Sequence, residues 1–558
     1  MSVEGVNMNT KNKSKYWIIT ILLLFFIIVP VITVFSEAII NNGRLDFMST
    51  FKIIVSSDNL KTIMNSILLG ILVVISATLI ATPLAFLLAR TKYAKYKWLD
   101  IIFMIPFMTP PYISSMGWIL FMQKRGLFQQ LFPWTGNFSE GFFSILGLTL
   151  VMSFHVFPFM TTILKNAILN IGNNLEESGA TSGGGFFYRM RRITLPLLKG
   201  NYAIAMLLVF VKTLSEYGTP ATFGKKIGFY VFTTDIHKYA TTSPIDFGKA
   251  ASLSSVLVCI CMVMWMIQNH VTERNTYELV GGKGNRERTY NSTTLVNLLG
   301  GIYIVALMIC AIGIPYFSII ATSLINLRGY GLAAGNFTFA HYKELFSDSS
   351  KALRALCTSF VLAVTSATLV SILGTLIVVT IQKEKKWKKK IESLALFPEM
   401  IPNIVLVIGM MLFWNKVYKI IPIYNTIYFM ILVYTVMFLP YAVQYVSSAL
   451  IQVNDNLITA AKVSGARKGY IFRRITLPLV MKGVISGWMM TFIIVFRELV
   501  AASLIAPPNV LTVSTYIVRE FEQGSVSTGM AMAVLCILLT TTALIMMEQL
   551  KIRKKEVN

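Results

Sequence analysis

Long apolar runs alternate with short polar segments along the whole chain. Each run approaches the roughly 20 residues that an α-helix needs to cross the hydrocarbon core of a bilayer. The pattern therefore predicts an all-α polytopic membrane protein with twelve transmembrane helices, six in each half. The runs lie near 17–36, 63–89, 99–122, 142–164, 198–218, 250–269, 295–324, 356–382, 394–415, 425–451, 480–504 and 527–547.

The first apolar run follows several lysines, as a secretory signal peptide would. It extends from Trp17 to Ser36, longer than the usual signal core, and further spans follow it. We therefore expect a retained first helix with the N-terminus inside.

A polar, charged stretch from His270 to Thr294 separates the two sets of six runs. It predicts a first half at 1–270, a cytoplasmic linker at 271–294 and a second half at 295–558. Strict alternation places the basic clusters at Arg90–Lys97, Lys383–Lys390 and Lys551–Lys555 on one side. Because basic loops favour the cytoplasm, both termini are expected inside.

Composition confirms the membrane class and bears on the partners. Hydrophobic residues make up 55% of the chain and charged residues only 13%. The 50 basic residues outnumber the 25 acidic ones, which could suggest nucleic acid, but they cluster in short loops between apolar runs. The expected partner of these basic residues is thus the lipid bilayer, with no nucleic acid.

One polar segment occurs twice. The sequence Arg-Arg-Ile-Thr-Leu-Pro-Leu stands at 191–197 and again at 473–479, 282 positions later. The same spacing separates Gly183 from Gly465, Pro158 from Pro440 and Glu216 from Glu498. A fixed period over this distance indicates a duplicated module. An even number of spans per copy makes the repeat parallel, about an axis along the membrane normal where a pore is expected.

Paired prolines recur in the third predicted helix of each half. Pro106 and Pro110 correspond to Pro398 and Pro402. Since proline removes a backbone donor, each pair predicts a kink. Whether the kink serves gating or is only tolerated by packing stays open.

The duplicated segment has the local signals of a helix-turn-helix outside the membrane. A helix-prone stretch is followed by a glycine, then by paired arginines, then by Leu-Pro leading into an apolar run. Proline is tolerated at a helix start, so we expect the next helix to begin there. An ordinary basic inside loop is the simpler alternative.

This pattern resembles the "EAA" coupling loop of ABC importer permeases, and the whole chain resembles their type I fold with both halves fused. The second copy has Thr459 where the family has glutamate, a departure that concerns a salt bridge rather than docking. The resemblance places coupling loops at 171–196 and 453–478. It assigns to them Glu177, Gly183, Arg191, Arg192, Ile193, Leu195, Pro196, Ala460, Ala461, Gly465, Arg473, Arg474, Ile475, Leu477 and Pro478.

The resemblance also implies partners and a location. In that family, two ATP-binding cassette subunits receive the loops from inside, and an extracytoplasmic solute-binding protein delivers the solute. The arginines would hold each loop against the partner or the lipid headgroups, and the glycines would permit the tight turn. The expected location is a bacterial inner or cytoplasmic membrane, with ATP-Mg bound by the partner.

The fused layout is most similar to the ferric-iron permeases, although thiamine and aminoethylphosphonate permeases share it. Glu216-Tyr217-Gly218 resembles a Glu-Phe-Gly segment of the iron group, whereas the second copy keeps only Glu498. Carboxylates suit a hard cation such as Fe³⁺. The two acids either contact solute or delivery protein at the outer mouth, or close a helix end beside Lys212 and Arg497.

Nothing in the sequence predicts chemistry of its own. The stretch Gly281–Gly284 lacks the spacing of a phosphate-binding loop, the five cysteines form no CxxC pair, and the four histidines have no metal-ligand spacing. We expect no enzyme, cofactor or metal. An ion-coupled secondary transporter would also explain twelve helices, but it predicts relay acids near the midplane and gives no reason for two matched loops.

Overall fold

The computed structural model describes residues 14–41, 43–136, 138–171, 178–179, 181–275, 294–348, 350–382 and 385–552. Nearly all of them are helical, and the sheet found among them is one antiparallel hairpin of β1 (Ile40–Asn41) and β2 (Arg44–Leu45). Most of the predicted linker falls on 276–293, outside the described residues.

Ten helices in the described part of the chain are long and apolar enough to cross a membrane, or eleven if one bent pair counts as a span. The prediction of twelve continuous helices is therefore not confirmed. The ten lie at Ser14–Ile39, Ser57–Arg90, Ile145–Asn170, Met190–Ser215, Phe247–Thr272, Thr294–Leu324, Lys351–Ile381, Ile427–Ile451, Gly469–Phe496 and Val526–Met546.

The third helix of each half is broken at its prolines. In the first half, α5 (Lys97–Met108) and α6 (Pro111–Met122) are separate helices. In the second half, α19 (Lys385–Met400) and α20 (Asn403–Val417) are bent by 104°. A residue before proline is pushed out of the helical region, and Thr109 has an extended backbone. The predicted kink is thus a full break.

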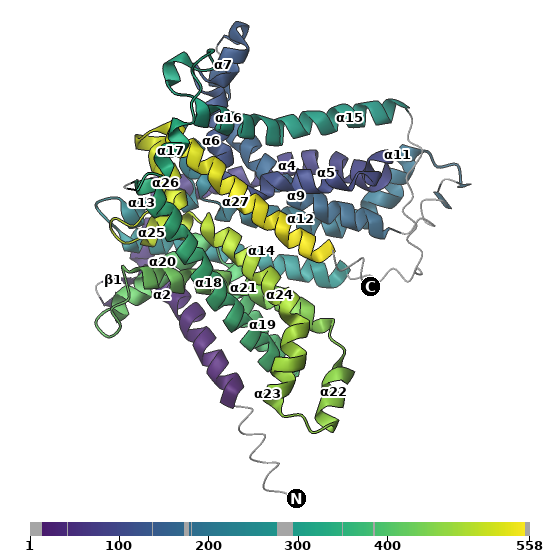
Figure 1. The fold of residues 1–558 in the computed structure, drawn as a ribbon, viewed down its shortest axis with the longest axis vertical. Helices are drawn as coiled ribbons and strands as arrows, with labels where there is room; N and C mark the ends of the chain where they lie inside the picture. The colour runs from purple at the N-terminus through teal and green to yellow at the C-terminus, as the bar shows by residue number, and fades with distance from the viewer. Residues whose placement is uncertain are drawn as a thin grey trace, which may run out of the picture. The chain divides into compact units, whose positions relative to one another are not determined.

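The chain forms two compact units. The first-half unit comprises Val55–Asp235 with Cys259–His341, and the second-half unit comprises Met1–Ile54, Ile236–Val258 and Tyr342–Asn558. Equivalent helices pack together in each unit (Figure 1). They are α4 (Ser57–Arg90), α9 (Ile145–Asn170) and α12 (Leu195–Ser215) in one, and α18 (Lys351–Ile381), α21 (Ile427–Ile451) and α24 (Leu477–Phe496) in the other.

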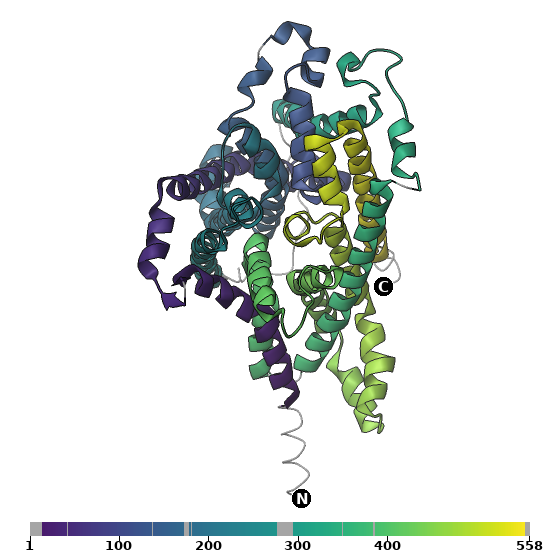
Figure 2. The same cartoon turned by 90° about the vertical axis from the view of Figure 1, so that its left-hand side faces the viewer.

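Each half contributes its first helix to the unit of the other half. The purple α2 (Val29–Ile39) packs on α20, and α16 (Ile314–Leu324) packs on α6 (Figures 1 and 2). A Cβ on Gly409 would lie 2.6 Å from the Pro30 carbonyl oxygen, and one on Gly117 would lie 2.7 Å from that of Pro315. These glycines allow the close backbone approach that joins the exchanged helices.

Four π-helical turns share one cause. Each ends two residues before a proline, whose ring cannot donate a backbone hydrogen bond and would clash with the carbonyl four residues earlier. Widening the helix to a π-turn accommodates this defect without ending the helix. The turns are η1 (Leu24–Ile28) before Pro30, η4 (Met190–Thr194) before Pro196, η6 (Ile309–Gly313) before Pro315 and η8 (Phe472–Thr476) before Pro478.

The remaining elements complete the described chain. They are α3 (Phe47–Val55), η2 (Lys92–Lys95), α7 (Leu127–Leu131), η3 (Pro133–Thr135), α8 (Phe138–Gly141), α11 (Phe186–Arg189), η5 (Pro220–Gly224), α13 (Phe232–Thr241), α14 (Phe247–Asn275), α15 (Thr294–Met308), η7 (Arg328–Tyr330), α17 (Ala340–Leu345), α22 (Asp455–Val463), α23 (Lys468–Ile471), α25 (Val500–Ile505), α26 (Val513–Gln523) and α27 (Val526–Ile552).

Candidate coupling site

The turn in the second repeated loop is closed by a glycine-dependent cap. Helix α22 (Asp455–Val463) ends two residues before Gly465, whose φ is +78°. The Ala466 N–H donates to the Ala461 carbonyl at 3.0 Å, and the Gly465 N–H donates to the Lys462 carbonyl at 3.0 Å. These two bonds make a Schellman motif, which needs a left-handed residue at the glycine position.

The first loop repeats this geometry. Gly183 has a φ of +80°, and the Gly184 N–H donates to the Gly179 carbonyl at 2.9 Å. A Cβ on Gly183 or Gly465 would meet no atom within 4 Å. The two glycines are therefore required by backbone conformation, as the sequence suggested, and not by lack of space.

Beyond each glycine the chain continues as one unbroken helix into the membrane span. Helix α11, turn η4 and helix α12 are contiguous from Phe186 to Ser215, about 45 Å at ~1.5 Å per residue. Helix α23, η8 and α24 are contiguous from Lys468 to Phe496. The α-helix begins at Leu-Pro in both copies as expected, but a π-turn joins it without a break to the short helix before it.

The predicted loop residues divide into an exposed and a partly covered group. The four paired arginines, Pro196, Pro478, Leu195 and Ala460 are exposed, whereas Ile193, Ile475, Leu477 and Ala461 are half-buried. Glu177 lies outside the described residues. In Figures 1 and 2 the hairpin of α22 and α23 extends beyond the ends of α21 and α24. A partner that approached this end would meet the exposed arginines.

Each loop also exposes a tyrosine that the sequence analysis missed. Tyr188 is 60% exposed and Tyr470 is 59% exposed, and Val463 near the second glycine is 84% exposed. The two tyrosines are themselves 282 positions apart, so the period could have identified them. Exposed aromatic side chains beside arginine are typical of interface anchors.

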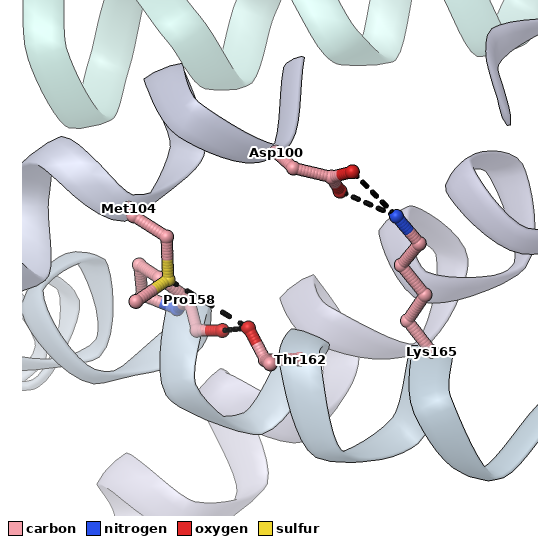
Figure 3. Close-up of polar contacts among 5 residues, drawn as sticks. All are labelled: Asp100, Met104, Pro158, Thr162 and Lys165. Carbon is pink, nitrogen blue, oxygen red and sulfur yellow. Dashed lines mark hydrogen bonds and ion pairs between the residues drawn. The ribbon is translucent and has the colours of Figure 1, made fainter. Parts of the chain in front are cut away.

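Side chains tie the loop-bearing helix α9 to the broken helix α5. Both carboxylate oxygens of Asp100 on α5 lie 2.6 Å from the Lys165 ammonium on α9 (Figure 3). Nearby, the Thr162 hydroxyl donates to the Pro158 carbonyl at 2.9 Å and lies 3.6 Å from the Met104 sulfur. A displacement of the loop end of α9 would therefore be passed to α5.

The second half has an equivalent side-chain contact between α19 and α21, made by different residue types. Glu392 on α19 occupies the place of Asp100, and Ser447 on α21 occupies that of Lys165. The Ser447 hydroxyl donates to the Glu392 carboxylate at 3.1 Å. The link is retained, but an ion pair is replaced by a single hydrogen bond.

At the far end of each continuous helix, the acid closes a helix break. The Glu216 carboxylate accepts the Thr219 N–H at 3.0 and 3.2 Å, at the entrance to η5. The Glu498 carboxylate accepts the Ala501 N–H at 3.0 and 3.1 Å and the Ala502 N–H at 3.1 Å. Both acids therefore cap the N-terminus of the short helix that follows.

The segment that follows the short helix is hydrogen-bonded to the backbone of the same acid. The Thr233 hydroxyl donates to the Glu216 carbonyl at 2.7 Å, and the Phe232 N–H donates to the Ser66 hydroxyl at 2.8 Å. The second-half counterparts are Ser514, which donates to the Glu498 carbonyl, and Val513, whose N–H donates to Ser359 at 2.8 Å. Each acid thus closes a helix end through backbone N–H groups, and its contact with solute or delivery protein stays a prediction.

The two halves differ at one polar position within the spans. The Lys212 ammonium lies 5.7 Å from the ring centre of Phe107 and 5.2 Å from that of Phe159. The counterpart of Phe107 is Glu399, whose carboxylate accepts a hydrogen bond from Gln444. The first half thus has a cation over aromatic rings where the second half has an anion held by an amide.

Among the residues that the structure describes, no three His, Cys, Asp or Glu side chains come together in a way that could hold a metal ion. The five cysteines are free thiols.

A repeated loop continuous with a membrane helix, on a chain of ten or more candidate spans, defines a multi-pass membrane protein with a duplicated loop. The sequence profile of the binding-protein-dependent transport system inner membrane component matches residues 81–277 and 370–555. The chain belongs to this family, and the two matches confirm the fused two-half layout. It is therefore a multi-pass inner membrane protein of a transport system that uses a solute-binding protein.

The chain is similar over most of its length to three curated ferric permeases. It is 24% identical to a putative ferric transport system permease protein FbpB 1 of Haemophilus influenzae, over 85% of this chain and 75% of that protein. It is 23% identical to the ferric transport system permease protein FbpB of Actinobacillus pleuropneumoniae, over 92% and 74%. It is 22% identical to the Fe(3+)-transport system permease protein FbpB 2 of Haemophilus influenzae, over 90% and 92%.

The glycine turn can be tested without any assay of transport. Gly465→Val should destabilise the left-handed turn by ~1–2 kcal/mol, since β-branched residues avoid this conformation. Amides of the 461–466 turn should then exchange with deuterium roughly 5- to 30-fold faster. Gly465→Asn is the matched control, because asparagine tolerates positive φ. Equal exchange in the valine, asparagine and wild-type chains would contradict the conformational requirement.

The capping role of the acids predicts a stability effect. Glu498→Ala leaves buried N–H groups without an acceptor, at ~1–3 kcal/mol each, and should lower the melting temperature of the purified chain by several degrees. Glu216→Ala should cost less, because Glu216 accepts fewer N–H groups. Glu140→Ala, at a half-exposed acid, is the control. If Glu498→Ala melts like the wild type but abolishes uptake, the acid serves the solute and not the helix end.

Proposed function

We propose that the chain is the permease subunit of an ATP-driven importer of ferric iron, in which both repeated loops dock ATP-binding subunits. The observation that carries this proposal is the loop geometry. Each loop has a glycine cap, an exposed arginine pair and an exposed tyrosine, and each is contiguous with a membrane-spanning helix. Family membership supplies the transport class.

The continuous helices transmit the motion of the loops. ATP-Mg is bound and hydrolysed on two partner subunits, whose closure pushes the arginine-bearing turns. A helix of about 45 Å without a break acts as a lever between that turn and Glu216 at its other end. The Asp100–Lys165 ion pair carries the same displacement into α5. Alternating access follows when both halves respond.

The proposed orientation places the loops and both termini in the cytoplasm. The Glu216 and Glu498 ends of the levers then lie toward the opposite side, where a solute-binding protein delivers its cargo. This orientation is supported by the basic loops at Arg90–Lys97 and Lys383–Lys390.

Iron is proposed on the strength of the ferric permeases to which the chain is similar. The assignment does not rest on Glu216 and Glu498, because their carboxylates are engaged with backbone N–H groups. Thiamine, aminoethylphosphonate and other small solutes remain the competing cargoes, and a distant competitor is ion-coupled transport without ATP.

The cargo is tested by ATPase activity of the chain copurified with its ATP-binding subunit. Binding protein loaded with Fe³⁺ should stimulate hydrolysis, whereas empty binding protein should not. Thiamine and aminoethylphosphonate, each with its own binding protein, are assayed in parallel. Stimulation by one of them would identify that solute, and not iron, as the cargo. Failure of any ATP-binding subunit to associate, together with ion-gradient-driven uptake in liposomes, would overturn the importer itself.

The docking surface is tested by charge reversal in one loop. Arg474→Glu should weaken association with the ATP-binding subunit about tenfold or more, since an interface arginine often contributes 2 kcal/mol or more. Lys419→Glu makes the same charge change at an exposed site between α20 and α21, the opposite end of the second-half unit, and should leave association unchanged. Equal binding by both variants would exclude Arg474 from the interface.

A further inference from the structure

A groove runs along helix α15 in the first-half unit. Its volume is about 720 Å³, and it is open along one side rather than enclosed. The lining residues on α15 and η6 recur along one face of the helix, from Thr294 to Ile309. At ~1.5 Å per residue the groove spans roughly 22 Å, enough to cross one leaflet of a hydrocarbon core about 30 Å thick.

The groove is polar at one end and apolar along the rest. Lys92, Tyr93, Thr294 and Asn297 form the polar end. The remaining wall is made of Leu298, Gly301, Ile302, Val305, Ala306 and Ile309. Leu298, Ile302, Val305 and Ile309 are each more than half exposed, so the described protein does not cover them. This division matches a lipid, with a headgroup at one end and an acyl chain beyond it.

A glycine and a tyrosine shape the polar end. The Tyr93 hydroxyl donates to the Asn297 carbonyl at 2.5 Å, which fixes η2 against α15. A Cβ on Gly301 would lie 2.7 Å from the Tyr93 hydroxyl oxygen. The absence of a side chain at Gly301 therefore leaves room for Tyr93 and keeps the groove open.

The polar end carries a cation suited to a phosphate. The Lys92 ammonium lies 5.3 Å from the centre of the Tyr93 ring. In the part of the chain that the structure describes, Lys92 is exposed and forms no ion pair. Lys95 and Lys97 are also exposed and add to the positive potential. Basic pockets at the end of a membrane helix attract anionic lipid headgroups.

The equivalent place in the second-half unit is filled by aromatic rings. The spacing from Pro30 to Pro315 aligns Tyr16 with Gly301 and Trp17 with Ile302. Tyr16 stacks on Trp387 at 6.0 Å, and Trp17 meets the same ring edge-on at 5.2 Å. The duplicated helix thus has bulky rings where the first-half unit has glycine and isoleucine, so the open groove is a feature of one half.

We propose that this groove binds one anionic phospholipid, with its phosphate on Lys92 and an acyl chain along Leu298, Ile302 and Val305. The lipid belongs to the leaflet that faces the loop end of the unit. Its assignment to the inner leaflet rests on the orientation proposed above, whereas the binding itself does not.

Native mass spectrometry of the full chain tests the site, with equal amounts of dioleoyl phosphatidylglycerol and dioleoyl phosphatidylcholine in the detergent. The wild type should retain one phosphatidylglycerol at least tenfold over phosphatidylcholine. Lys92→Gln should reduce that ratio to near one, and Ile302→Trp, which copies the second half, should reduce retention of both lipids about tenfold. Inorganic phosphate should not displace the lipid.

Matched controls separate the site from the general surface. Lys124→Gln removes an exposed lysine at the opposite end of the unit, and Leu299→Trp adds the same ring on a face of α15 that does not line the groove. Both should retain lipid like the wild type. Equal retention across all five chains, no retained lipid in the wild type, or displacement by inorganic phosphate would each overturn the proposal. None of these results depends on ATPase activity or on the cargo.

Discussion

Every backbone N–H and C=O group at membrane depth needs an internal partner, and the fold depends on how this chain meets that requirement where its helices stop. After α12 and α24 the helix breaks, and side chains take over from the missing helical bonds. Glu216 and Glu498 accept the N–H groups that open the next short helix. Thr233 and Ser514 return a hydroxyl to the carbonyl of the same acid. Each acid thus connects the end of the long helix to the start of the short helix that follows it.

The same requirement explains why the helices that follow the repeated loops are continuous. A proline near the membrane surface would ordinarily end a helix, and the loop would then be hinged to its span. At Pro196 and Pro478 the chain instead widens into a π-turn and continues. A hinge would absorb displacement, whereas a continuous helix transmits it. The chain changes direction instead at Gly183 and Gly465, whose left-handed backbone closes the turn before each continuous helix.

The sequence predicted the features that depend on local pattern and period. Ten of the twelve expected spans, both left-handed glycines and the fused two-half layout are found. Hydropathy could not reveal the break between α19 and α20, because mean hydropathy does not depend on the direction of the helix axis. The prolines nevertheless indicated where the break lies. The exchange of first helices depends on contacts such as Gly409 with Pro30, which no local signal contains. The capping role of Glu498 was similarly hidden, since the N–H groups it accepts are created by the break.

The duplication serves as an internal comparison of what the fold requires and what it permits. Positions that close the helix breaks keep their chemistry, as Ser66 and Ser359 show by accepting equivalent N–H groups. Positions that connect two helices keep a polar contact but change its type, from an ion pair at Asp100 to a hydrogen bond at Glu392. Within the spans, Phe107 and Glu399 share neither charge nor partner. Charge at membrane depth is costly, and the Glu399 carboxylate is offset there by the hydrogen bond from Gln444. The halves are therefore alike where they close helix breaks and unlike at polar positions within the spans.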